Sequence, residues 1–83
     1  MAATRQDIER WFDRGIAAGA THMIIVCDTF DHSDYPVYVE PGEDAREVAS
    51  QYHGQNMQRV MEVYSLSISK AAQMAERRAF HYD

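Results

Sequence analysis

Four residues that can ligate metals or transfer protons lie close together in the middle of the chain: Asp28, Asp31, His32 and Asp34. Carboxylate oxygens at such spacings are ligands for Ca²⁺ or Mg²⁺, and a neighbouring imidazole also admits Zn²⁺ or Mn²⁺. The calcium-loop pattern is absent, because its central glycine and final glutamate are both missing. Aspartate and serine side chains also bond to nearby backbone groups in turns. We therefore interpret the cluster first as a turn, and a small metal-binding or catalytic module centred on it is the alternative.

A cysteine nucleophile is the second candidate for chemistry, since Cys27 directly precedes Asp28. A reactive cysteine needs an electropositive, partly exposed setting, whereas Cys27 ends an apolar run and is followed by an acid. The four histidines show no His-x-x-x-His spacing, and a single cysteine cannot form a Cys-x-x-Cys pair. We predict that Cys27 is a small buried hydrophobe and that the protein has no catalytic residue, metal site or cofactor.

Acidic residues are concentrated in the segment 28–47. It holds seven acids and a single arginine, a formal charge of −6, whereas the whole chain carries −5. Such asymmetry shapes the surface field and disfavours direct binding to nucleic acid, which requires a basic stripe. We predict that this segment binds a basic surface on another protein. The predicted contact residues are Asp28, Asp31, Asp34, Tyr38, Glu40, Glu43, Asp44 and Glu47.

Tyr38 is the aromatic member of this predicted surface, and its orientation has two interpretations. Strand alternation places Tyr35, Val37 and Val39 on one face and Tyr38 on the other. If the valines face the core, Tyr38 points outward beside the acids, where an aromatic ring can contribute much of a binding energy. The alternative is that Tyr38 packs under a helix.

Six elements are expected to position these residues. The apolar stripe Ile8, Trp11, Phe12 and Ile16 predicts a helix over residues 4–18, with Thr4 as its N-cap and Gly19 as its stop. Strands are predicted over 21–30, 35–39 and 57–66, and helices over 43–53 and from residue 67 or 69 to about 80. The segment 57–66 also fits a helical stripe, and we choose strand because it is rich in β-formers.

The continuous apolar run of residues 21–30 is typical of a central strand that is covered on both faces. Pro36 cannot donate to a strand ladder, which favours an edge position for residues 35–39. The sequence therefore predicts one α+β domain over residues 1–83, in the order α-β-β-α-β-α. Its three-stranded, mostly antiparallel sheet has the order 2-1-3 and is packed by helices. The predicted core is a single cluster of Trp11, Phe12, Ile24, Val26 and Val63.

The stretch 26–39, Val-Cys-Asp-Thr-Phe-Asp-His-Ser-Asp-Tyr-Pro-Val-Tyr-Val, resembles a recurring core of small uncharacterised proteins from bacteria and phages. The likeness continues through residues 56–64 and 76–79. This resemblance implies a compact cytoplasmic protein and brings no activity with it.

Cysteine content and hydropathy also indicate a cytoplasmic protein. One cysteine allows no internal disulfide, which fits a reducing cytosol. No secretory signal pattern is present, and the longest apolar run, residues 23–27, is far shorter than the roughly 20 residues of a membrane span. We expect a non-enzymatic cytoplasmic interaction protein, in its narrower form a phage-type anti-defence inhibitor that mimics nucleic acid. A homodimer through a sheet edge or the alanine-rich last helix is compatible with this expectation.

Overall fold

The computed structural model describes residues 3–54, 57–76 and 78–82. The described residues form α1 (Arg5–Ala17), β1 (His22–Asp28), β2 (Ser33–Val39), α2 (Ala45–Tyr52), β3 (Gln58–Ser65) and α3 (Lys70–Met74). The sheet has the order β2-β1-β3, and β1 is antiparallel to both neighbours. The predicted α+β class, element order and sheet order are confirmed, as are the central position of β1 and the edge position of β2.

Helix α1 begins and ends at the predicted signals. The Thr4 hydroxyl accepts a hydrogen bond from the Asp7 backbone N–H at 3.1 Å, and the Asp7 carboxylate accepts one from the Thr4 N–H at 3.0 Å. The bond from the Thr4 N–H is the largest cause that holds the pKa of the Asp7 carboxyl below its ordinary value, followed by the Thr4 hydroxyl and Arg10. Gly19 follows the helix with a φ of +80°, a conformation that glycine adopts without steric cost.

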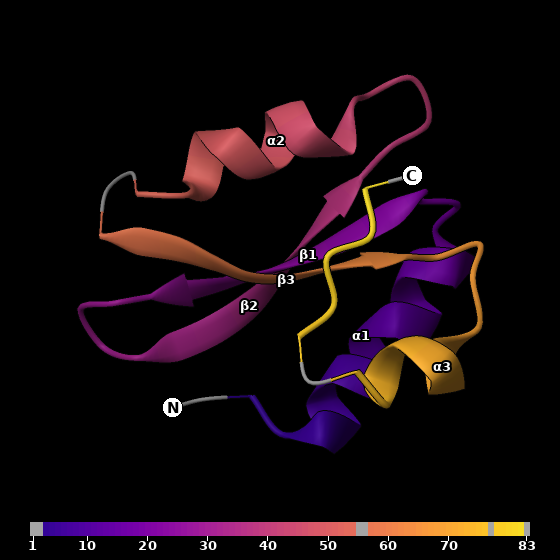
Figure 1. Ribbon diagram of the computed structural model, residues 1–83, viewed down its shortest axis with the longest axis horizontal. Helices are drawn as coiled ribbons and strands as arrows, with labels where there is room; N and C mark the ends of the chain where they lie inside the picture. The colour runs from indigo at the N-terminus through magenta and orange to yellow at the C-terminus, as the bar shows by residue number, and fades with distance from the viewer. Residues whose placement is uncertain (1–2, 55–56, 77, 83) are drawn as a thin grey trace.

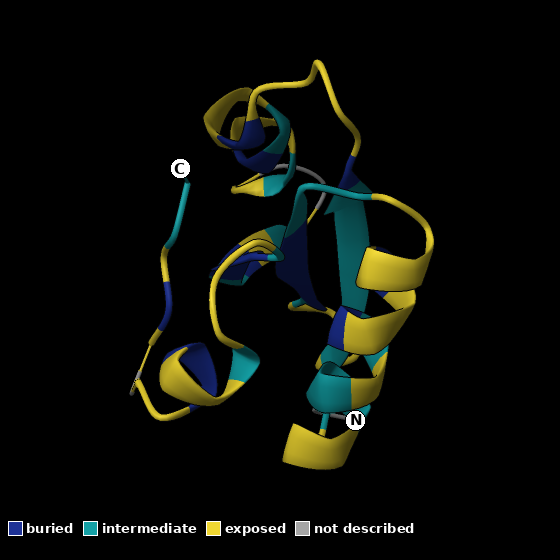
Figure 2. Ribbon diagram, turned by 90° about the vertical axis from the view of Figure 1, so that its right-hand side faces the viewer, coloured by how far each residue is buried: buried dark blue, intermediate teal, exposed yellow. Residues whose placement is uncertain are grey.

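Helices cover both faces of the sheet, with α2 on one side and α1 and α3 on the other (Figure 1). The buried cluster under α2 consists of Ile24, Val26, Val39, Ala45, Ala49, Val60 and Val63. The cluster on the opposite face consists of Phe12, Met23, Ile25, Tyr64, Met74 and Ala79. Figure 2 shows the buried segments where the sheet meets the helices. Strand β1 supplies both clusters, which explains its unbroken apolar run.

The expected single core cluster is wrong, because alternate side chains of a strand point to opposite faces. Ile24, Val26 and Val63 lie in the cluster under α2, whereas Phe12 lies in the other. Trp11 is half-buried at the margin of the Phe12 cluster.

The last helix is much shorter than predicted. Helix α3 ends at Met74, and residues 79–82 run extended beside β3 (Figure 1). The Val63 N–H donates to the Ala79 carbonyl at 2.8 Å, and the His81 N–H donates to the Val63 carbonyl at 2.9 Å. Ala79 is fully buried. Pairing with β3 prevails over helix propensity here because the edge of a strand carries backbone groups that need partners.

Side chains complete the outer edge of β3. The Gln73 carboxamide accepts from the Ser65 N–H at 2.8 Å and donates to the Ser65 carbonyl at 2.8 Å, as a neighbouring strand would. Both residues are fully buried. Nearer the start of β3, the Val60 N–H donates to Nδ1 of His53 at 3.2 Å. The edge is therefore occupied at three places along the strand.

Candidate functional site

Two of the three predicted contact residues of the β1–β2 hairpin, Asp28 and Asp31, organise its turn. Asp28 accepts a hydrogen bond from the Phe30 N–H at 2.9 Å, and Asp31 accepts bonds from the N–H and the hydroxyl of Ser33. The Ser33 hydroxyl is the largest cause of a lowered pKa at Asp31. Asp34 accepts a bond from the N–H of Ala3 at 3.0 Å. The interpretation of this cluster as turn chemistry agrees with these contacts, and the lowered pKa keeps Asp31 ionised at neutral pH.

The other acids lie where β2 ends and α2 begins. The Asp44 side chain caps α2 by accepting a bond from the Arg46 N–H at 2.9 Å. The Glu43 carboxylate accepts one from the Glu40 N–H at 3.0 Å. Glu47 is exposed in the first turn of α2, where a negative charge interacts favourably with the helix dipole. These acids therefore also stabilise the backbone of the β2–α2 connection and the start of α2.

The structure does not gather the predicted contact residues into one surface. Strand β2 has seven residues and lies between the two acidic groups. At the usual rise per residue, a strand of this length spans about 20 Å. Figure 1 shows the hairpin turn and the β2–α2 connection at opposite ends of the sheet. Each acidic group must therefore be considered as a separate candidate.

Of the two interpretations of Tyr38, the one in which it packs under a helix is confirmed: it lies under α1 and does not point outward. Its hydroxyl donates to the Trp11 carbonyl at 2.8 Å, and burial raises its pKa. A Cβ atom built on Gly15 would lie 2.7 Å from the Tyr38 ring, which shows how closely the helix approaches. Two helices pack on that face of the sheet, and they leave no room for an outward tyrosine. Tyr38 is therefore not available as the aromatic contact beside the acids.

An exposed aromatic residue does lie beside the hairpin acids, and it is not among the predicted contact residues. The Phe30 side chain is 76% exposed, between Asp28 and Asp31. The neighbouring Thr29 donates both its N–H and its hydroxyl to the Met57 carbonyl, each at 2.7 Å, and Met57 is also exposed. The signal was present in the sequence, since an apolar residue inside a run of turn formers has no strand face to join.

The chemical alternatives receive no support from the described residues. Cys27 is buried, and its pKa is raised chiefly by desolvation and then by its contact with Asp34, as expected for an unreactive thiol. Within residues 3–54, 57–76 and 78–82, no group of three or more His, Cys, Asp or Glu side chains is arranged to hold a metal ion. No helix in this part of the chain is long and apolar enough to cross a membrane.

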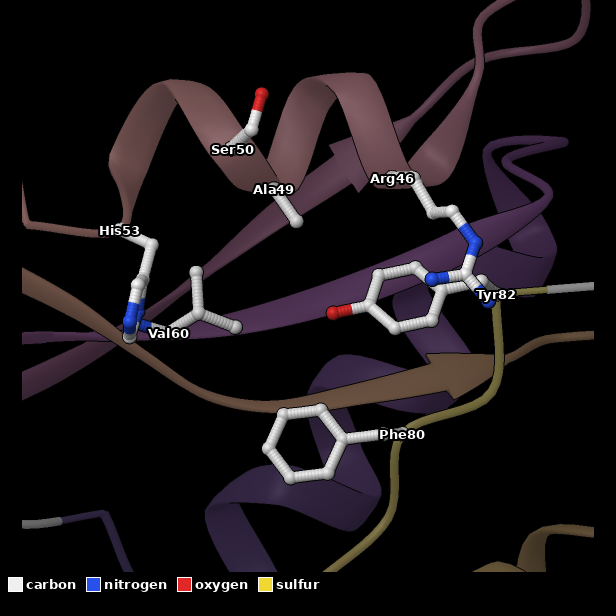
Figure 3. Close-up of a pocket in the computed structure, with 7 residues that line it drawn as sticks. All are labelled: Arg46, Ala49, Ser50, His53, Val60, Phe80 and Tyr82. Carbon is white, nitrogen blue, oxygen red and sulfur yellow. The ribbon is translucent and has the colours of Figure 1, made fainter.

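A second surface feature is a groove between α2 and the C-terminal segment (Figure 3). It has a volume of about 440 Å³ and is lined by Arg46, Ala49, Ser50, His53, Val60, Phe80 and Tyr82. The Arg46 guanidinium lies 4.4 Å from the centre of the Tyr82 ring, within cation–π distance. The groove was not predictable from the helix expected up to about residue 80, because it forms only where the chain pairs with β3.

Comparisons of the chain with protein-family models, with curated proteins and with solved structures gave no match.

Proposed function

We propose that this protein is a non-enzymatic interaction protein that binds a basic surface on a partner protein through the tip of the β1–β2 hairpin. The observation that carries the proposal is the exposure of Phe30 between Asp28 and Asp31. A large aromatic side chain in water is unfavourable for a monomer, and it supplies apolar contact area when a partner covers it. Asp28 and Asp31 supply the charge that would select a basic partner.

The hairpin tip is well suited to this role because it is anchored. The turn is held by the bonds to Asp28 and Asp31, and Thr29 ties it to Met57. A preorganised loop loses less conformational entropy on binding than a mobile one. Strand β1, whose interior residues are all buried, provides the rigid base.

Charge and aromatic contact should affect binding kinetics differently. Long-range attraction accelerates association and weakens with salt, since the Debye length falls from about 10 Å at 0.1 M to about 3 Å at 1 M. Contact area mainly slows dissociation. We therefore expect Asp31→Lys to lower the association rate and Phe30→Ala to raise the dissociation rate.

The test uses a partner isolated from the native host and compares variants by surface plasmon resonance. Glu43→Lys is the matched control for Asp31→Lys, because it makes the same charge change in the other acidic group. Phe80→Ala is the matched control for Phe30→Ala, because Phe80 is also exposed but lies outside the hairpin. The proposal is refuted by a partner whose affinity is unaffected by salt, by Asp31→Lys and by Phe30→Ala. If Glu43→Lys alone weakens binding, the other acidic group is the contact surface.

In its narrower form, this proposal is that the protein is a phage-type inhibitor that occupies a nucleic-acid groove on the partner. DNA should then compete with the protein for its partner. A partner that binds no nucleic acid removes the narrower form and leaves the broader one intact.

We do not extend the proposal to a homodimer. Pro36 interrupts the N–H donors of the β2 edge, and the outer edge of β3 is occupied by the C-terminal segment and by side chains. Helix α3 has only five residues.

A further inference from the structure

The groove beside α2 exists because the C-terminal segment pairs with β3. Phe80 lies beside Val63 in a parallel bridge, and side chains alternate along an extended chain. Ala79 therefore joins the cluster under α1 and α3, while Phe80 and Tyr82 line the groove on the α2 side. Figure 3 shows both rings below the helix.

The floor and walls of the groove are largely apolar. Val60 and Ala49 are buried members of the core cluster under α2, and Phe80 remains 48% exposed. The volume of about 440 Å³ is within the usual range of small-molecule sites, roughly 300–1,000 Å³. A planar aromatic ligand placed against Phe80 would cover apolar surface that is now in contact with water.

The Arg46 guanidinium and Nε2 of His53 supply hydrogen-bond donors to the groove. Among the described residues, no carboxylate forms an ion pair with the Arg46 guanidinium, which stacks on Tyr82 and keeps its N–H edges available. The Val60 N–H donates to Nδ1 of His53, so the proton of the neutral imidazole is on Nε2. None of the seven lining residues is acidic, in a chain with thirteen acids.

Acidic side chains are found on the other side of the Arg46–Tyr82 pair. Glu43 and Asp44 line an adjoining hollow with His22. An anion would therefore be accommodated only on the His53 side of Arg46. The polarity of the two hollows fixes the orientation of a ligand that has one apolar and one anionic end.

We propose that this groove binds a small aromatic carboxylate. Its ring packs against Phe80 and Val60, and its carboxylate accepts hydrogen bonds from the Arg46 guanidinium, whose planar fork matches a carboxylate. The site is separate from the hairpin tip, so this inference does not depend on the proposed function.

A series of isosteric probes tests the charge preference on the unmodified protein. Naphthalene-2-carboxylate, 2-naphthalenemethanol and 2-naphthalenemethylammonium share a ring and differ in charge. Titration into ¹⁵N-labelled protein, followed by amide chemical shifts, should give the tightest binding for the carboxylate and the weakest for the ammonium. We expect a difference of about tenfold between these two, as one charge-assisted contact gives. The shifted amides should include those of Val60, Phe80 and Tyr82.

Variants assign the contacts. Arg46→Gln should reduce the affinity for the carboxylate to that for the alcohol, Arg46→Lys should retain most of the preference, and Phe80→Ala should weaken all three probes. Arg14→Gln is the matched control, since it removes the same charge from α1 on the opposite side of the sheet. Equal or tighter binding of the ammonium, or shifts scattered over the whole protein, would overturn the proposal. Because the probe series needs no substitution, an unfolded variant would not prevent this decision.

Discussion

Replacing Gln73 by leucine removes the carboxamide that stands in for a neighbouring strand at Ser65. Leucine has a similar volume, so the change mainly withdraws one acceptor and one donor, each at 2.8 Å from the buried Ser65 backbone. A buried polar group left without a partner costs about 1–3 kcal/mol. Two such groups lower the free energy of unfolding by about 2–6 kcal/mol, a large part of the 5–15 kcal/mol that is typical of small domains.

Thermal denaturation followed by circular dichroism measures this loss, with Gln51→Leu as the matched control on the exposed side of α2. For a chain of this length each kcal/mol corresponds to about 4–8 °C in Tm. We expect Gln73→Leu to melt at least about 8 °C below the parent and Gln51→Leu to melt within a few degrees of it. A leucine variant as stable as the control would show that the carboxamide does not substitute for a strand.

The substitution Gln73→Glu adds a dependence on pH. A protonated carboxyl can donate to the Ser65 carbonyl, whereas a carboxylate cannot, so folding raises the pKa of the introduced group above its unfolded value of about 4.3. The stability from this bond is present below the unfolded pKa and is lost as pH rises through the raised one. The lowered pKa values of Asp7 and Asp31 give stability that is lost in acid in the parent and in the variant alike, so they leave the gap between the two unchanged. The stability gap between variant and parent should therefore shrink from about pH 8 to about pH 5. A constant gap would refute the reasoning.

Three further changes have defined outcomes in the same denaturation assay. Gly15→Ala should cost about 1–3 kcal/mol, because the added Cβ would lie 2.7 Å from the Tyr38 ring; a neutral result would mean that the helix moves freely away from the sheet. Thr4→Ala should cost about 1 kcal/mol through loss of the helix cap, and Thr4→Ser should restore it. Ile24→Ala should cost about 2–5 kcal/mol at a fully buried site, and Trp11→Ala should cost less because that side chain is only half-buried; the reverse order would contradict the position of Trp11 at the margin of its cluster.

Local signals in the sequence were sufficient for most of the elements. The capping pair Thr4 and Asp7 and the following Gly19 act within a few residues, and the structure uses them as predicted. The apolar run of β1 indicated that this strand is central, and the position of Pro36 indicated that β2 is at the edge. Such patterns are reliable because their partners are close in the chain or because burial on both faces leaves no polar position.

Non-local contacts account for the errors. The alanines after residue 70 favour a helix on propensity, and only the unpaired edge of β3, far back in the sequence, explains why Ala79 is extended. The orientation of Tyr38 depended on whether a helix would cover its face, which its own strand does not specify. The groove also depends on non-local contacts, since it requires the extended C-terminal segment and the placement of α2 over the sheet. Tertiary context overrides local propensity in each case.

The concentration of acids in residues 28–47 has a local explanation for most of its members. Asp28, Asp31, Asp34, Glu43 and Asp44 each accept a backbone N–H in a turn, at a strand edge or at a helix start. Charge density alone is therefore weak support for a binding surface, because the same carboxylates satisfy donors that the fold would otherwise leave to water. Phe30 has no corresponding role, since its exposed ring joins neither core cluster. The case for a partner at the hairpin tip depends on that ring, and the acids around it determine only which partners it would accept.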